Sequence, residues 1–195
     1  ATNFTGLVKR FRDSLNVKAP KAGITLCLPG FDPKGAYQID SLRSLVDQFI
    51  IKPYSNTVAS GPGPVAPLQS GSYWENNSID ASVSAWIKSG IPREKILLSV
   101  PTFSLKWEPR LSTALTRQAM GPPELITYSE LKRNYNYPSN WDSLARENTF
   151  SVLGSSESPQ HFEIHASDEK SIRPRFDYAT DRNLGGVAIW DLGYG

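Results

Sequence analysis

Four short, uninterrupted apolar runs constrain the fold of this 195-residue chain more than any other feature. They occupy residues 23–30 (GITLCLPG), 48–54 (QFIIKPY), 95–103 (KILLSVPTF) and 186–190 (GVAIW). A strand with one solvated face alternates apolar and polar residues, so continuous runs indicate strands covered on both faces. We therefore predict an α/β chain with four parallel strands, in which Cys27 is a small buried core residue.

Segments with helical periodicity separate these runs. The first helix is marked by one apolar stripe, formed by Phe4, Leu7, Val8, Phe11 and Leu15, with Thr2 or Asn3 as its cap. Short helices are predicted over 39–47 and over 78–90, the latter capped by Ser78 and ended by Gly90. A loop rich in glycine, proline and serine, containing GPGPVAPL, fills residues 55–77 between the run at 48–54 and the helix over 78–90.

The last helix is predicted over 171–183, and it leads into the fourth run. Ser171 can cap it, which places Pro174 in the first turn, where its missing N–H costs little. Strand–helix alternation of this kind fits half of an eight-stranded barrel. It fits a small open sheet equally well, so pattern alone does not choose between them.

The alternation of predicted strands and helices is interrupted between the third and fourth apolar runs. Residues 128–134 (YSELKRN) predict a short helix, and residues 149–154 (TFSVLG) and 161–165 (HFEIH) predict the strands of a hairpin. We therefore divide the chain into a half-barrel domain over 1–105 and 167–195 and an α+β insertion over 106–166.

Composition excludes several classes of protein. With 39% hydrophobic and 21% charged residues, the chain has the make-up of a folded domain rather than a disordered one. The net charge of +2 argues against a nucleic-acid partner, and Lys9, Arg10 and Arg12 are interpreted as a solvated helix face. No apolar stretch approaches the roughly 20 residues that span a membrane, so no membrane association is predicted. No signal peptide is recognised, and no cofactor is predicted.

The order of the short motifs resembles the C-terminal half of glycoside hydrolase family 18, the chitinases and chitinase-like lectins. NFTGLVKRFRDSLN is similar to the helix after the family's catalytic strand, and QFIIKPYSN to the strand that usually ends Met-x-Tyr-Asp. The segments SIDASVSAWIKSGIPREKILLSVPTF and SDEKSIRPRFDYATDRNLGGVAIWDL are similar to the helix–strand units on either side of the family's insertion. The GPGPVAPL loop is especially similar to that of nematode chitinase-like proteins.

The resemblance implies a partial (β/α)8 TIM barrel, made of strands five to eight with an α+β insertion between the last two. It also implies an extracellular protein that binds chitin or oligomers of N-acetylglucosamine (GlcNAc). In the family, the tryptophan that ends the last strand is the floor of the central sugar subsite, and Trp190 matches it. Tyr54 matches the tyrosine that hydrogen-bonds the N-acetyl group. Without the resemblance, Trp190 would be interpreted as a core residue.

Other site positions depart from the family pattern. Lys52 stands where the family usually has methionine, and Ser55 where it has an aspartate that helps to hold the sugar. Phe103 stands where tyrosine is common, and Trp107 follows the third run where a cleft wall should rise. We expect Phe103 and Trp107 to be possible walls of the site and Ser55 to be a weakened contact. Tyr73 and Trp74 could extend a groove or pack within their loop.

The family's general acid, the glutamate that closes D-x-x-D-x-D-x-E, has no counterpart in the 195 residues. That glutamate protonates the glycosidic oxygen, and the substrate's own N-acetyl group attacks the anomeric carbon. We therefore predict a carbohydrate-binding chitinase-like protein. The alternatives are a chitinase whose acid lies on a missing or companion segment and an interaction protein that has lost the sugar. A lone half-barrel would expose strand edges and an apolar sheet face, so we expect a companion chain, a homodimer or a longer protein to complete it.

Other groups of residues in the sequence indicate a function less strongly. His161, Glu163 and His165 alternate along a predicted strand and could bind zinc, but we expect all three to face water while Phe162 and Ile164 pack inward. Trp86 is interpreted as a core residue of its helix. No serine–histidine–acid order and no phosphate-binding glycine loop occurs in the sequence.

Overall fold

The computed structural model describes residues 2–32, 34–54, 61–75, 77–108, 119–135, 137–152 and 161–194. The chain is an α/β protein with one parallel and one antiparallel sheet. The parallel sheet has the order β1-β2-β3-β9, from strands β1 (Thr25–Pro29), β2 (Gln48–Lys52), β3 (Ile96–Pro101) and β9 (Gly186–Trp190). These are the four apolar runs: β9 has the bounds of its run, and the other three strands are shorter than theirs.

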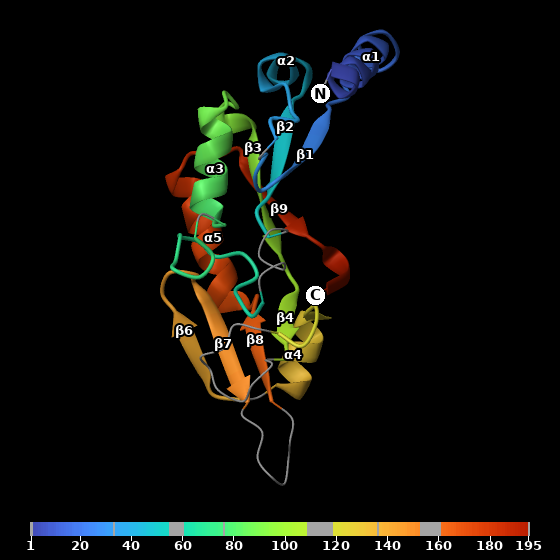
Figure 1. Ribbon diagram of the computed structural model, residues 1–195. Helices are drawn as coiled ribbons and strands as arrows, with labels where there is room; N and C mark the ends of the chain where they lie inside the picture. The colour runs from blue at the N-terminus through green and yellow to red at the C-terminus, as the bar shows by residue number, and fades with distance from the viewer. Residues whose placement is uncertain are drawn as a thin grey trace.

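The antiparallel sheet lies between β3 and β9 in the sequence and has the order β5-β4-β8-β7-β6. Its strands are β4 (Ser104–Trp107), β5 (Glu124–Ile126), β6 (Ser139–Asp142), β7 (Glu147–Val152) and β8 (Phe162–Ala166). The predicted hairpin of β7 and β8 is confirmed, with Phe150 opposite Ile164. Figure 1 shows the parallel sheet in the upper part of the molecule and the antiparallel sheet below it, with β3 leading into β4.

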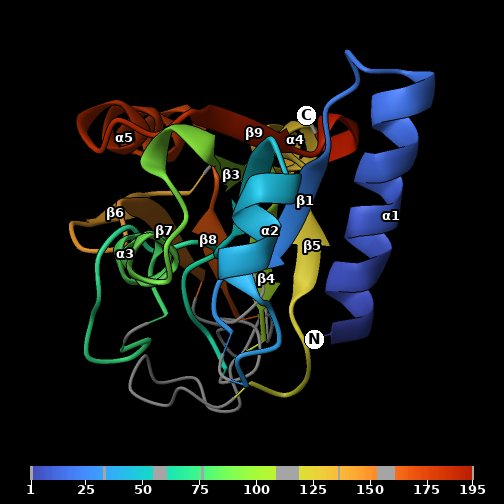
Figure 2. The ribbon, with the colours of Figure 1, turned by 90° about the horizontal axis from the view of Figure 1, so that it is seen from above.

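The helices are α1 (Thr2–Lys18), α2 (Ile39–Leu45), α3 (Ile79–Lys88), α4 (Tyr128–Asn134) and α5 (Glu169–Asp181), with short 3₁₀ turns at Arg93–Lys95 and Leu192–Tyr194. The predicted ends of α3 are confirmed. The Ser78 side chain accepts a hydrogen bond from Ala81 N–H, and Gly90 adopts a φ of 104° just beyond the helix. From above, α1 stands beside β1 at one side of the molecule, with α3 and α5 toward the other (Figure 2).

The start of α5 corrects the prediction. Its cap is Asp168, whose side chain accepts from Ser171 N–H while the Ser171 hydroxyl accepts from Asp168 N–H. Ser171 is therefore the third residue of a capping box and not the cap itself. Pro174 consequently lies inside the helix, where it cannot donate to the carbonyl of Lys170.

Two further predictions are also wrong, namely the cap of α1 and the burial of Cys27. In α1, Val8 is buried and Phe4 packs against the core, but Leu7 and Phe11 are exposed, because they lie on the flank of the stripe that turns away from the sheet. The helix already includes Thr2 and Asn3, so neither is its cap. Cys27 is exposed rather than buried.

The exposure of Cys27 follows from the way the strands are covered. On β1 and β2 the alternate residues Leu28, Phe49 and Ile51 are buried, whereas Cys27 and Gln48 are exposed. Only β3, in the middle of the sheet, is covered on both faces as predicted. No helix among the described residues is long and apolar enough to cross a membrane.

Candidate functional site

The candidate site lies at the carboxyl end of the parallel sheet. Lys52 ends β2, Tyr54 follows it by two residues, and Trp190 ends β9. Because the strands are parallel, their carboxyl ends share one edge, and side chains there converge from segments far apart in the sequence. The Lys52 Nζ atom lies 3.7 Å from the centroid of the Trp190 ring and 5.7 Å from that of Tyr54.

Trp190 presents an aromatic ring at this edge. Like its neighbour Ile189 on β9, Trp190 is 42% exposed. Its backbone is fixed, since Trp190 O accepts a 2.8 Å hydrogen bond from Thr102 N–H, and the Thr102 hydroxyl donates to Asp191 O at 2.8 Å. The peptide bond between Trp190 and Asp191 is cis. The two hydrogen bonds anchor the backbone of Trp190, and its indole forms an aromatic surface at this edge of the sheet.

Tyr54 lies beneath this surface and is only 6% exposed. Its hydroxyl shares a 3.0 Å hydrogen bond with the hydroxyl of Ser99 on β3, and its ring meets Phe103 edge to face at 5.7 Å. Burial raises the pKa of the Tyr54 hydroxyl to about 12, assisted by the nearby Cys27 and Asp191 and opposed by the Ser99 hydrogen bond. The phenol is therefore neutral at physiological pH and able to donate a hydrogen bond.

The two predicted walls are buried. Phe103 is 8% exposed and Trp107 is 1% exposed, both within the main hydrophobic core. Trp107 is too deeply buried here to present a ring face to a ligand. The described residues therefore do not support the prediction that Trp107 forms a wall of the cleft. Its indole Nε1 has no hydrogen-bond partner there. Ser55 lies outside the described residues.

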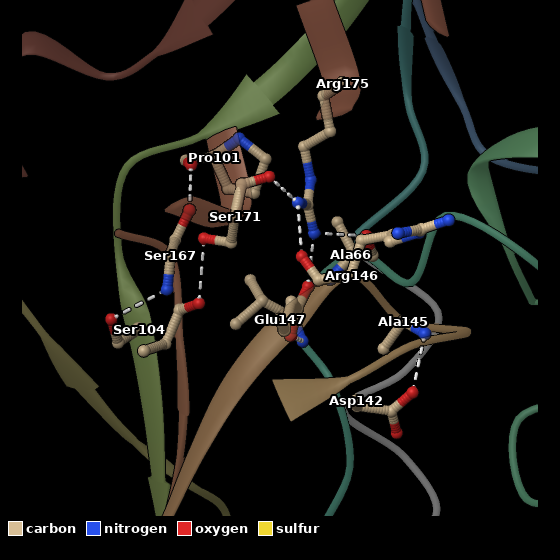
Figure 3. A network of polar contacts seen from close by, with 12 residues as sticks. Ala66, Pro101, Ser104, Asp142, Ala145, Arg146, Glu147, Ser167, Ser171 and Arg175 are labelled. Carbon is tan, nitrogen blue, oxygen red and sulfur yellow. Dashed lines mark hydrogen bonds and ion pairs between the residues drawn. The ribbon is translucent and has the colours of Figure 1, made fainter. Parts of the chain in front are cut away.

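Sequence reasoning missed the clamp on the GPGPVAPL loop (Figure 3). The loop is buried from Pro62 to Leu68, and the Glu147 carboxylate accepts 2.8 Å hydrogen bonds from Val65 N–H and Ala66 N–H. The same carboxylate pairs with Arg175 of α5 at 2.5 Å, and both side chains are fully buried. One ion pair therefore joins the loop that follows Tyr54 to the antiparallel sheet and to the last helix.

The Arg175 guanidinium donates several hydrogen bonds besides its ion pair. Its guanidinium donates to the carbonyl oxygens of Ala66 at 2.7 Å, Arg146 at 3.2 Å and Ser171. Burial lowers the pKa of Arg175, and the charge of Glu147 acts in the opposite direction. Charged residues are almost never fully buried unless they are paired. Nothing in the sequence joins the two, because α5 also carries Lys170, Arg173 and Asp177 and its pattern does not single out Arg175.

The alternating His161, Glu163 and His165 differ from the prediction in one respect. Phe162 and Ile164 are buried as expected, but His165 is buried as well, with its Nε2 atom 2.6 Å from a carboxylate oxygen of Glu163. Leu105 and Thr149 flank His165 on the neighbouring strands of the sheet, which keeps it from water. No group of three possible metal ligands occurs in the described part of the chain.

Three comparisons place the chain among known proteins. The family model for glycosyl hydrolases family 18 matches residues 1–195. The chain is 24% identical to chitinase-like protein Idgf2 of Drosophila melanogaster, over 98% of this chain and 51% of that protein. It thus spans about half the length of this relative.

Solved structures share the fold. A family 18 N-acetylglucosaminidase from Paenibacillus barengoltzii superposes with a TM-score of 0.82 at 22% identity, covering 100% of this chain and 60% of that one. A mutant class V chitinase from Nicotiana tobaccum, in complex with NAG4, superposes with a TM-score of 0.81 at 17% identity, with coverage of 100% and 60%.

Proposed function

Because the chain belongs to glycosyl hydrolases family 18, we propose that it binds oligomers of GlcNAc at the carboxyl end of its parallel sheet. The observation that carries this proposal is the half-exposed ring of Trp190 on its anchored backbone. A flat indole can pack against the C–H face of a sugar ring and exclude water from it. Tyr54 supplies a neutral hydroxyl close by. The chitinase that shares the fold is described in complex with NAG4, which is consistent with such a ligand.

We further propose that β1, β2, β3 and β9 are strands five to eight of a TIM barrel. The order of the strands and their parallel register support this, as does the coverage of only 60% of the matched chains. The insertion would run over 106–166, although β4 begins slightly earlier, at Ser104. Strands one to four would come from a longer chain, a companion or a second copy, and an extracellular location remains part of the proposal.

Catalysis is the rival proposal. No D-x-x-D-x-D-x-E run occurs in the 195 residues, so this chain supplies no matching general acid, and positioned proton transfer contributes a factor of roughly 10² to 10⁴. Native mass spectrometry with sequencing of every chain would find an acid on a companion. Release of fluorophore from a fluorogenic chitobioside by the same material would favour the chitinase alternative.

Binding is tested by titrating chitotetraose into the protein in a calorimeter. Trp190→Ala should weaken binding about thirtyfold, since loss of a central aromatic contact costs about 2 kcal/mol. Phe11→Ala is the matched control, because Phe11 is an exposed aromatic residue on the distant α1 and should leave the affinity unchanged. If the wild-type chain binds no GlcNAc oligomer at millimolar concentration, the sugar-binding proposal is wrong and an interaction protein becomes the better hypothesis.

A further inference from the structure

The ammonium group of Lys52 already lies on the surface that the proposed sugar would use. At 3.7 Å from the ring centroid, Lys52 Nζ sits against one face of Trp190, well inside the roughly 6 Å range of a cation–π contact. The lysine stem is half-buried, whereas the tryptophan is 42% exposed. The side chain of Lys52 reaches Trp190 across β3, because β2 and β9 are the neighbours of β3 in the sheet.

This cation has no acidic partner among the described residues. Its contacts there are the rings of Trp190 and Tyr54. Other cations are engaged differently: Lys106 pairs with Glu124, and Lys95 donates to the carbonyl oxygens of Arg43 and Val46. Asp191, which adjoins Trp190 in the chain, accepts instead from Gly193 N–H at 3.0 Å. Lys52 therefore places a positive charge with no ion-pair partner among the described residues at the candidate site, where the Asp191 carboxylate is close enough to raise the pKa of Tyr54.

A neutral sugar and a negatively charged sugar should interact with the Lys52 ammonium in different ways. A neutral ring that stacks on the covered face must first displace the ammonium, which should weaken its binding roughly two- to fivefold. An anionic group on the ligand draws the ammonium onto itself in a charge-assisted hydrogen bond, and the ring face becomes free for the neighbouring sugar. Such a contact strengthens binding by roughly tenfold relative to the neutral ligand.

We propose that Lys52 makes this a site for an anionic GlcNAc-containing glycan, whose negative charge is a carboxylate or a sulfate ester beside the sugar that stacks on Trp190. Lys52 is then the residue that determines specificity, and Trp190 supplies the stacking surface. The inference rests on the proposed function, because it presumes that a glycan binds here at all.

The test compares three tetrasaccharides by calorimetry on the full chain: neutral chitotetraose, an alternating GlcNAc–N-acetylmuramic acid oligomer that carries carboxylates, and 6-O-sulfated chitotetraose. We expect at least one anionic ligand to bind roughly tenfold more tightly than chitotetraose, and the stronger of the two identifies the source of the charge. Raising the salt concentration should weaken the anionic complex and leave the neutral one unchanged.

Lys52→Met removes the charge and keeps an unbranched side chain of similar length. It should abolish the preference for the anion and strengthen chitotetraose binding roughly two- to fivefold. Lys170→Met is the matched control, since Lys170 lies 4.3 Å from the centroid of Trp141 in the same kind of contact elsewhere. This variant loses the same net charge and should retain the preference. Unchanged thermal unfolding of both variants would establish that each is folded.

Three outcomes overturn the inference in distinguishable ways. If chitotetraose binds in a Trp190-dependent manner with no preference for an anion, or if the preference survives in Lys52→Met, the role of Lys52 is wrong while the sugar site stands. If chitotetraose binds only Lys52→Met, the ammonium blocks the site rather than recognising a ligand. If no tetrasaccharide binds any variant, the proposed function fails together with the inference.

Discussion

Replacing Glu147 with glutamine removes the negative charge that holds the buried GPGPVAPL loop against α5. The carboxylate uses both oxygens, accepting from Val65 N–H and Ala66 N–H at 2.8 Å each and from Arg175 at 2.5 Å. A glutamine side chain has one acceptor oxygen, so one backbone N–H loses its partner. The charge of Arg175 is then left at zero exposure without its ion-pair partner, and only the Asp168 carboxylate still acts on it.

The size of the effect follows from that burial. Breaking a buried ion pair by removing one partner costs roughly 3–5 kcal/mol. A domain has a total stability of about 5–15 kcal/mol, so the loss is a large fraction of the whole. With an m-value of about 2 kcal/mol per molar urea, the unfolding midpoint should fall by roughly 1.5–2.5 M.

Glu124→Gln is the matched control, because its ion pair with Lys106 is partly exposed, with 58% of the Glu124 side chain accessible. Exposed pairs contribute about 0–1 kcal/mol, so its midpoint should barely move. Should Glu147→Gln fail to fold, the double change Glu147→Gln with Arg175→Met also removes the buried positive charge while keeping one acceptor oxygen for the loop, and it should be more stable than Glu147→Gln alone. Hydrogen exchange supplies a local measurement, in which Val65 and Ala66 N–H are protected in the wild-type chain and open in Glu147→Gln. A Glu147→Gln midpoint equal to that of Glu124→Gln would refute the clamp.

Two further predictions concern Tyr54 and the start of α5. Ultraviolet titration should show a tyrosine that ionises at about pH 12, and this step should vanish in Tyr54→Phe. Because the pKa of Tyr54 is higher in the folded chain than in the unfolded one, its stabilising contribution is complete below about pH 10 and is lost as the pH rises toward 12. Asp168→Ala should lower the free energy of unfolding by about 1 kcal/mol in urea denaturation, while Asp168→Asn, which keeps a capping oxygen, should lose much less. Equal losses in both variants would contradict the capping role of Asp168.

The sequence alone predicted the local elements well. The four strands, the α3 helix with its Ser78 cap, the short α4 helix over 128–134 and the β7–β8 hairpin all lie where periodicity placed them. Their signals are local, since the repeat of a helix or a strand and the residues at its ends are written within a few positions. The family was recognised from the order of these elements, and the match over 1–195 confirms it.

The sequence predictions differ from the structure where burial depends on residues far away in the chain and where a local signal fits two interpretations. The apolar stripe of α1 is a local signal, yet Leu7 and Phe11 within it are exposed, because burial requires a surface to pack against and only Phe4 and Val8 of the helix meet the core. Cys27 was placed in the core because its run is apolar, but strand alternation directs it to the exposed side. Asp168 was overlooked as the cap of α5 because Ser171, its partner in the capping box, is an equally good capping residue.

Composition and pattern by themselves determined the α/β class and the positions of most elements, whereas Trp190 and Tyr54 became candidate site residues through the resemblance to family 18. Only the tertiary structure decided what those residues contact. It set the ammonium of Lys52 on the ring of Trp190 and the carboxylate of Glu147 between a loop and the guanidinium of Arg175. Attraction between charges and rings acts over a few ångströms of space, whereas these partners are joined by many residues of chain. Sheet order and register bring them together, and neither is written in any short stretch of sequence.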